Sequence, residues 1–385
     1  MRLGLETEVW DIVQDGAKLV ITTGGKQTTR KFISPDHAAI QMKKLIAEKV
    51  TAGWTETDAA ITLAPTEPQE PALEQEVLAA LDDPGPYSVY GDWYQHQNHP
   101  RGELIALQQA DEDHDSAKFK GAINTIFVRH KSVLLGPLAE LGGDSFEWRN
   151  GFIYGITLEG HTAGALVRAV AAHPSGRFLG AVRTDPEGSS IDAERTTSEV
   201  FAALQPVART LREIVIEQGP DMPALDVITE MPNLRELELA TVEGFRSVAP
   251  ITKVSAKLSR LALRGALDWI ELAPLFERED LRLRELAYCA PQLPQMLHAL
   301  AESPLATHLE SLRIPYQPSG DVSYLVAHRE RFPKLRQITA TLEMLTIEAR
   351  NGLKSMARLV DAPLYEDDFA QRLGYDEDHF DNVQE

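Results

Sequence analysis

Apolar residues recur along most of the chain in a short strand-like pattern, apolar-x-x-apolar-x-apolar. Eight copies occur at intervals of 23 to 32 residues, beginning at Ile153, Leu179, Leu211, Leu234, Leu258, Leu283, Leu309 and Leu335. Alternation of this kind is typical of strands that are buried on one face. Helix-like segments lie between the later copies, and several of them end at a proline just before the next strand. The pattern therefore predicts an α/β repeat array over residues 151–342.

The first 60 residues follow a different pattern. Three β-rich segments are separated by turns that contain Gly16 and Gly24. A helix is then predicted to begin at Pro35, with Ser34 as its N-cap, and to end at Gly53. We therefore expect a separate α+β domain at residues 1–60.

The remaining segments differ in composition. Residues 61–71 contain three prolines without an apolar period, which predicts an exposed linker. Residues 72–150 read as a small helical domain. Residues 343–385 begin with a helix-like stretch that is expected to cap the array and end in an acidic tail with eight acids and one arginine after Pro363.

The repeat pattern resembles leucine-rich repeats, whose period is about 20–29 residues. The resemblance rests on copies such as LRELEL at Leu234, LSRLAL at Leu258 and LRELAY at Leu283. It implies a solenoid whose strands line a concave sheet, the surface on which such repeats bind partners. The asparagine or cysteine that usually follows the strand is missing, and Val242 and Ala266 stand at such positions, which implies irregular curvature.

The N-terminal domain resembles the WGR domain of poly(ADP-ribose) polymerases and many bacterial proteins. The matching features are the early strand with Trp10, the turn at residues 24–27 and the helix that leads to Trp54. The Trp-Gly-Arg tripeptide itself is replaced by Ile21-Thr22-Thr23. Since that segment supports nucleic-acid contacts in the family, its loss disfavours DNA binding here.

Residues 72–150 resemble the short repeat-companion domain of bacterial multi-domain proteins. The resemblance rests on an acidic turn before Pro84, an aromatic-x-Asp-Trp helix ending in Trp93, and the Pro-Arg-x-Glu helix that follows. The family implies no chemistry. We expect Asp92 and Arg101 to form an ion pair that orients the two helices.

The charge balance narrows the classes of partner. The chain has 38 basic and 58 acidic residues, a net charge of −20, whereas residues 1–60 are neutral overall. This negative charge disfavours a nucleic-acid binder that attracts phosphates through its overall electrostatic field, and it disfavours docking on an anionic membrane. The single cysteine excludes an intramolecular disulfide and is typical of a reducing compartment. With no long apolar run and a charged N-terminus, we expect a cytoplasmic protein without a membrane span.

Candidate chemical motifs are weak. The turn before Lys26 lacks the spacing of a phosphate-binding loop, and the acidic run at 111–115 lacks the glycine of a calcium loop. His96 and His99 are separated by a helix-breaking segment, and Cys289 has no second cysteine nearby. We therefore predict a protein that is not an enzyme and uses no cofactor or metal.

These features favour a non-catalytic scaffold that binds a protein partner on the concave face of the repeats. An inhibitor, adaptor or escort of an enzyme encoded nearby is a more specific form of this hypothesis. The alternative is a DNA-associated regulator that uses the WGR-like domain, and a third class is an enzyme whose site is assembled from loops. The sequence leaves the partner, the oligomeric state and the packing of the domains open.

Partner contacts are predicted at the strand positions that point away from the core. The N-terminal copies carry mostly acids there, with Arg183 as an exception, and the acids are Glu159, Asp185, Glu213, Glu217, Glu236 and Glu238. The later copies carry Arg260, Arg264 and Arg313, together with Glu285. The groove is therefore expected to be acidic toward its N-terminal end and basic toward its C-terminal end. The alternative is that these charges only keep the sheet soluble.

Overall fold

The computed structural model divides into two compact units, residues 1–64 and 65–385, with the boundary inside the segment predicted as a linker. The residues that it describes are 2–5, 8–15, 17–23, 26–51, 55–56, 67–114, 117–140, 146–158, 163–184, 196–219, 224–241, 247–264, 269–289, 293–314 and 322–362. The predicted acidic tail, Glu159 and Asp185 lie outside the described residues.

The first unit is an antiparallel five-stranded sheet with strand order β4-β3-β2-β1-β5. Its elements are β1 (Arg2–Leu5), β2 (Glu8–Asp15), β3 (Lys18–Thr23), β4 (Lys26–Lys31), α1 (Pro35–Thr51) and β5 (Thr55–Glu56). Ile12, Leu19 and Ile21 are buried together with Ala38 of α1. The hydroxyl of Ser34 accepts a 3.2 Å hydrogen bond from the backbone N–H of His37, so the predicted helix start is confirmed.

The second unit opens with helices that begin at prolines. They are α2 (Pro71–Ala79), α3 (Pro84–His96) and α4 (Pro100–His114), and α5 (Ala117–Leu134) follows them without a proline at its start. Proline suits the first position of α2, α3 and α4 because the N–H that it lacks would have no helical acceptor there. Within the described part of the chain, every helix is too short or too polar to cross a lipid bilayer.

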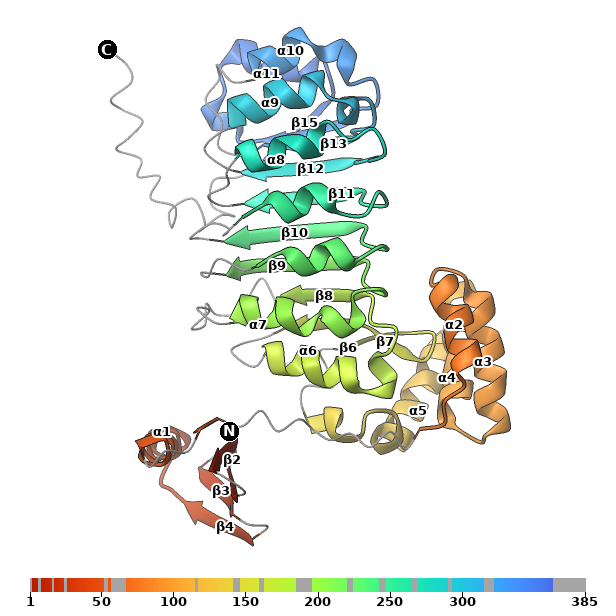
Figure 1. Cartoon of the computed structure of the whole chain (residues 1–385), viewed down its shortest axis with the longest axis vertical. Coiled ribbons are helices and arrows are strands. Elements are labelled where there is room, and N and C mark those ends of the chain that lie inside the picture. Colours follow the sequence, from red (N-terminus) through yellow and green to blue (C-terminus); the bar gives the residue numbers. More distant parts are fainter. Residues whose placement is uncertain are drawn as a thin grey trace. The chain divides into compact units, whose positions relative to one another are not determined.

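A ten-stranded sheet follows, in which β7 to β15 are parallel and lie in chain order (Figure 1). The parallel strands are β7 (Phe152–Leu158), β8 (Ala181–Thr184), β9 (Glu213–Gly219), β10 (Glu236–Thr241), β11 (Arg260–Arg264), β12 (Glu285–Cys289), β13 (Ser311–Arg313), β14 (Gln337–Ala340) and β15 (Arg358–Asp361). All eight predicted strand patterns contain a strand. The sheet extends one strand past the predicted end of the array at residue 342. The protein is thus a mixed α/β protein.

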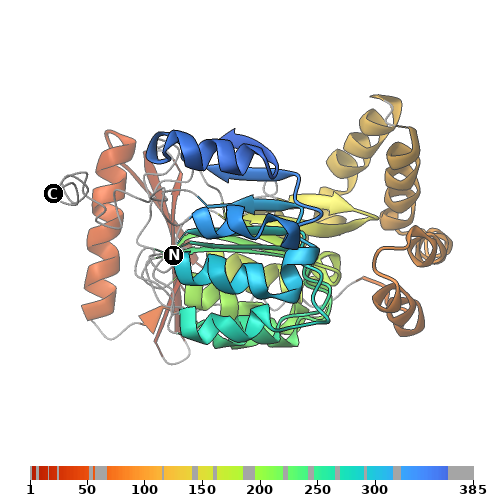
Figure 2. The same ribbon diagram turned by 90° about the horizontal axis from the view of Figure 1, so that it is seen from above.

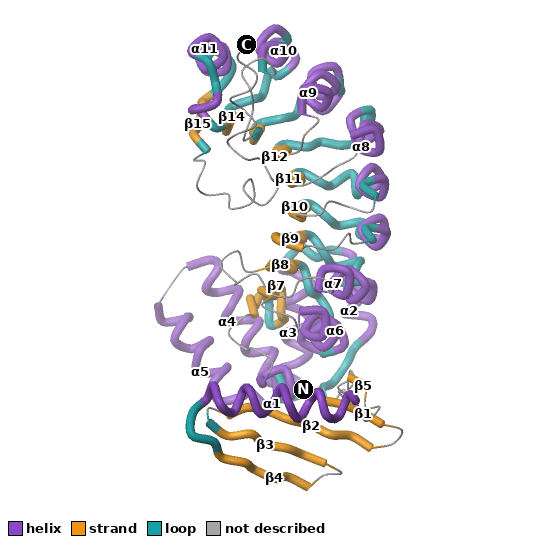
Figure 3. Tube along the Cα trace, turned by 90° about the vertical axis from the view of Figure 1, so that its left-hand side faces the viewer, coloured by secondary structure: helices purple, strands orange, loops and turns teal. Residues whose placement is uncertain are grey.

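Helices connect the parallel strands and cover one face of the sheet (Figure 3). The α-helices are α6 (Ala163–Ala172), α7 (Thr196–Ala203), α8 (Trp269–Phe276), α9 (Leu293–Glu302), α10 (Ser323–Ala327) and α11 (Ile347–Lys354). The predicted helix at 227–233 is instead a 3-10 helix, η6 (Asp226–Glu230), and η7 (Ala249–Lys253) has the same form. In the view from above, the orange helices α2–α5 lie at one side of the sheet (Figure 2).

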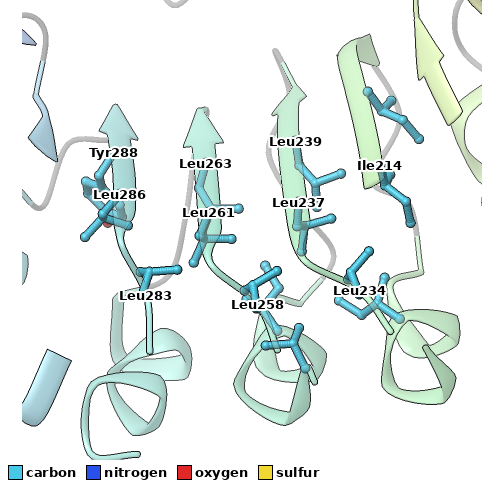
Figure 4. Close-up of a cluster of buried hydrophobic side chains, with 14 of the residues drawn as sticks. Ile214, Leu234, Leu237, Leu239, Leu258, Leu261, Leu263, Leu283, Leu286 and Tyr288 are labelled. Atoms are coloured by element: carbon cyan, nitrogen blue, oxygen red, sulfur yellow. The ribbon is translucent and has the colours of Figure 1, made fainter. Parts of the chain in front are cut away.

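The core of the second unit repeats one register position from strand to strand. The inward residues at this position are Ile156, Val182, Ile214, Leu237, Leu261, Leu286, Leu312 and Ile338, each at most 2% exposed. Leucines of the preceding turns, such as Leu234 and Leu258, pack beside them (Figure 4). Burial of each such side chain contributes about 1.5–3 kcal/mol before the entropy cost of folding. No single repeat encloses this core, so the strands depend on their neighbours.

A hairpin closes the N-terminal edge of the sheet. Strand β6 (Phe146–Arg149) pairs antiparallel with β7 through the two residues Asn150 and Gly151, whose φ angles are +48° and +78°. Two successive positive φ angles are the requirement of a type I′ turn. The turn is fixed by α4, since the amide of Gly151 donates to Oε1 of Gln108 at 2.6 Å.

A buried arginine joins this hairpin to the helices. The side chain of Arg101 is fully buried, and its Nε and Nη2 donate to the two carboxylate oxygens of Glu67 at 2.5 and 2.7 Å. Its Nη2 also donates to Oγ of Ser175 at 2.8 Å, and its Nη1 donates to the carbonyl of Gly151. Burial disfavours the charge of Glu67, but the Arg101 guanidinium outweighs this and keeps the pKa of Glu67 below its usual value.

Two sequence expectations are corrected by this cluster. Arg101 pairs with Glu67, while Asp92 is exposed on α3, because α4 turns Arg101 inward toward the hairpin. The predicted linker is also not exposed throughout, since Glu67 is only 9% exposed. The end of that segment is part of the folded second unit.

The first prediction concerns the buried pair. Glu67→Gln leaves the buried Arg101 charge without a counter-ion, so we expect a loss of about 3 kcal/mol in the free energy of unfolding. Urea unfolding measures this loss. Glu76→Gln on the exposed side of α2 is the control and is expected to change stability by less than about 0.5 kcal/mol. Equal stability of the two variants would contradict a structural role of the pair.

The second prediction concerns His173, which is 7% exposed and accepts a 3.0 Å hydrogen bond at Nδ1 from the backbone N–H of Ser175. Burial, aided by the charge of Arg101, lowers the pKa of His173 to about 4. The unfolded state therefore binds a proton more readily between pH 6.5 and 4, and stability must fall as the pH falls through this window. We expect His173→Asn, which keeps an acceptor in the capping position, to flatten this fall in unfolding experiments at pH 7 and pH 5. An unchanged pH dependence in the variant would assign the fall to other groups.

Candidate functional site

The face of the sheet opposite the repeat helices carries two outward-facing positions per strand. We call this surface the open face, and its described residues include Glu147, Arg183, Glu213, Val215, Glu236, Glu238, Arg260, Ala262, Arg264, Glu285, Ala287, Ser311, Arg313, Gln337 and Thr339. Each position aligns across the strands because the register is in phase. Side chains far apart in the sequence therefore form continuous rows on this face.

Arg183 organises the N-terminal part of the open face. Its Nε and Nη2 donate to both carboxylate oxygens of Glu213 on β9 at 2.5 and 2.7 Å, and its Nη1 donates to Glu147 on β6 at 2.8 Å. The hydrogen bond to Glu213 is the main cause that raises the pKa of Arg183 above its usual value. One arginine thus bridges three strands and pairs with two carboxylates, which leaves one negative charge in this group.

Glu238 organises the middle of the open face. Glu238 is only 5% exposed, and its Oε1 accepts a hydrogen bond from Nη2 of Arg264 at 2.6 Å. Its Oε2 accepts from Nη2 of Arg260 at 3.1 Å. The guanidinium of Arg260 also lies 3.4 Å from Glu236 and 3.7 Å from Glu285, measured between charged nitrogen and carboxylate oxygen. Acids of β10 and β12 therefore surround the cations of β11.

These ion pairs connect the expected acidic part of the groove to the expected basic part. Arg260 and Arg264 do not form a basic end that is separate from the acids, because adjacent strands bring Glu236 and Glu238 against them. The strand register places residues 22 to 26 positions apart side by side. Arg260 and Arg264 are already paired within the chain, and the three acids and two arginines of these strands leave one negative charge.

The predicted site residues are nevertheless brought together on one surface. Glu213, Glu236, Glu238, Arg260 and Arg264 lie on consecutive strands from β9 to β11. Arg313 lies two strands further on, in β13, and is half-buried. Glu217 belongs to β9, but its side chain is outside the described residues.

Glu147 is a member of this surface that the repeat pattern did not identify. It lies in β6, ahead of the first predicted repeat. The Asn150-Gly151 dipeptide, flanked by alternating apolar residues, is the signal that would have indicated a hairpin there.

The other chemical candidates do not gather into a site. Among the described residues, no three or more histidine, cysteine, aspartate or glutamate side chains are placed to hold a metal ion. The Nδ1 of His96 lies 2.8 Å from the carbonyl of Asp92, while the ring of His99 packs on Tyr94 with centroids 5.1 Å apart. Cys289 ends β12 opposite Arg264 and is half-buried.

Comparisons with known proteins leave the family unassigned. No protein-family model matches the chain, and no curated protein matches it in sequence. Among solved structures, the chain is similar to a Bacteroides fragilis protein determined by a structural-genomics consortium. The two share 15% sequence identity with a TM-score of 0.36, over 93% of this chain and 94% of that chain. A likeness of this degree carries no argument about fold or function.

The third prediction tests the internal pairing of the open face. Glu238→Gln removes the shared counter-charge of Arg260 and Arg264 in a nearly buried position, so we expect a loss of about 1–3 kcal/mol in unfolding free energy. Glu236→Gln is the matched control on the same strand, and because its carboxylate is exposed it should cost less than about 1 kcal/mol. Thermal and urea unfolding of both variants provide the comparison. If Glu236→Gln is the more damaging change, the assignment of Glu238 as the central acid is wrong.

Proposed function

We propose that the protein is a non-catalytic interaction scaffold of the leucine-rich repeat type, and that it binds a protein partner on the open face. The observation that carries the proposal is the in-phase sheet with its helices on one side, which leaves rows of partly exposed side chains on the other. Extended repeat sheets are suited to recognising large partners. The WGR-like and repeat-companion assignments of the N-terminal regions belong to the same proposal.

The C-terminal part of the open face is the best candidate for the contact itself. Toward the N-terminal end, Arg183 and Glu238 are engaged in internal ion pairs. From β12 onward the face carries fewer charges, and its residues there are Glu285, Ala287, Ser311, Arg313, Gln337 and Thr339. A partner would displace water here without breaking a buried network, which favours binding.

The proposed partner is a protein, and an enzyme encoded nearby that is inhibited or escorted is a specific form of the proposal. DNA association through the WGR-like unit is the alternative. The neutral net charge of residues 1–60 gives that alternative little electrostatic support, since phosphate binding depends on an excess of lysine and arginine.

The fourth prediction tests the open face by charge exchange. The double variant Glu285→Lys/Arg313→Glu reverses two charges on neighbouring strands and leaves the net charge unchanged, so long-range steering is preserved. The control Glu348→Lys/Lys354→Glu makes the same exchange on exposed positions of α11. Affinity capture from a native lysate, quantified by mass spectrometry, should recover one protein with the wild type and with the control. Recovery should fall at least about tenfold with the open-face variant.

Two results would overturn the proposal. If the open-face variant recovers the same protein as efficiently as the wild type, the contact lies elsewhere on the molecule. If the wild type retains DNA and no protein, and this retention weakens steeply as salt rises, the regulator alternative replaces the scaffold.

A further inference from the structure

The turns that precede the parallel strands form a stack of their own. In each turn the residue just before the strand donates its backbone N–H to the carbonyl of the equivalent residue in the previous turn. The stacked residues are Arg212, Arg235, Ser259, Arg284, Glu310 and Arg336, with N–O distances of 2.7 to 2.8 Å. Residues about 25 positions apart in the chain are therefore direct neighbours along this edge of the sheet.

The stacked turns point their polar side chains outward. The residue before each stacked position is a buried leucine, and because side chains alternate, the residues on either side of that leucine face away from the core. In the turns around Leu258, Leu283 and Leu335 these outward residues include five exposed cations. We call them the basic turn strip: Lys257, Arg282, Arg284, Lys334 and Arg336. In a chain with a net charge of −20, such a cluster stands out.

Carboxylates do not neutralise the basic turn strip. The Nζ of Lys257 donates to the side-chain oxygen of Asn233 at 2.6 Å, and Arg282 donates to backbone carbonyls of its own turn. Within the described part of the chain, no carboxylate oxygen lies within ion-pair distance of the five cations.

The turn around Leu309 lies between the turns of Leu283 and Leu335 and carries an acid and a histidine at its outward positions. Glu310 lies between Arg284 and Arg336 in the stack and is the one acid at the outward positions of these four turns, all of which are described. His308, at the other outward position of that turn, is half-buried. Burial and then the charges of Arg282 and Lys334 lower its pKa, which agrees with a positive local potential along the strip.

The chain itself shows how an acid docks on this edge. Asp82, in the turn before α3, places its Oδ1 2.9 Å from Nη1 of Arg212, and its Oδ2 pairs with Arg235. One carboxylate thus bridges two stacked turns. Arg284 and Arg336 belong to later turns of the same column, with Glu310 between them.

We propose that the basic turn strip is a docking site for an acidic, extended segment of a protein partner, whose aspartate and glutamate side chains bind the arginines as Asp82 does. The strip is only as long as a few sheet spacings of about 4.8 Å, which suits a short peptide segment. A nucleic acid is disfavoured because a long polyanion would also meet the 58 acidic residues of the chain. The inference does not depend on binding at the open face.

The test uses a fluorescein-labelled oligo-glutamate peptide and fluorescence anisotropy at low salt, with the full-length chain. Arg284→Glu/Arg336→Glu should weaken peptide binding at least about tenfold. The control Arg129→Glu/Lys131→Glu makes the same net-charge change on exposed positions of α5 and should weaken it no more than about twofold. Glu310→Gln should strengthen binding, a gain that misfolding cannot mimic. Thermal unfolding of each variant checks that it is folded, and Arg284→Gln/Arg336→Gln replaces the reversal if that variant unfolds.

Four outcomes overturn the proposal. Equal binding by the wild type and the Arg284/Arg336 variants excludes the strip, and so does weakening by the α5 control to the same extent. If an unlabelled single-stranded oligonucleotide of equal charge competes more strongly than unlabelled peptide, the ligand is a nucleic acid. If Glu366→Gln/Asp367→Asn/Asp368→Asn tightens peptide binding several-fold, the chain's own C-terminal acids are the occupant in place of a partner segment.

Discussion

The structure of the second unit depends on keeping successive parallel strands in register. One inward position, occupied from Ile156 to Ile338 by aliphatic residues alone, repeats without a break along the sheet. A slip of one residue in a strand would expose that side chain, and in β10 it would bury Glu236 or Glu238 in its place. The same register aligns the outward rows and stacks the turns. Both candidate binding surfaces are therefore consequences of how the core is packed.

A sheet of this kind needs protection at its ends, because an edge strand offers unpaired backbone groups to other chains. At the N-terminal edge, the terminal strand is β6, which pairs antiparallel with β7 through the Asn150-Gly151 turn and, with only 4 residues, offers few unpaired groups. The buried Arg101 then ties that turn to α4 and, through Glu67, to the chain entering the unit. A fully buried ion pair stabilises little compared with apolar residues, but it is directional. Here the paired groups come from four separate segments, so their alignment sets how the helices meet the sheet.

The sequence predicted the repeating part of the fold well, for a physical reason. Leu234, Leu237 and Leu239 mark a strand because burial alternates along it, and this information is local. The pairing of Arg260 with Glu238 is set by which residues of neighbouring strands lie opposite, and that depends on loop lengths that no local pattern reveals. For the same reason Arg101 was assigned to nearby Asp92, although its partner Glu67 lies 34 residues away. β15 was missed because a short strand, Arg358–Asp361, follows a helix-like stretch and shows only a single alternation.

The two candidate surfaces differ in how many of their charged groups are still able to form ion pairs with a partner. On the open face, Arg260 and Arg264 already share Glu238, so a partner that approaches them must compete with pairs formed at no cost in association entropy. Along the turns, the backbone stack holds the turn of Lys257 next to that of Arg282, while Arg284 and Arg336 lie on either side of Glu310. Among the described residues, Arg284 and Arg336 have no carboxylate within ion-pair distance, and they need no rearrangement of the main chain to receive a ligand carboxylate. In an acidic protein, acids that are paired with arginines and cations that lack a carboxylate partner therefore indicate different roles. The first stabilise the sheet, and the second mark where an acidic partner is attracted.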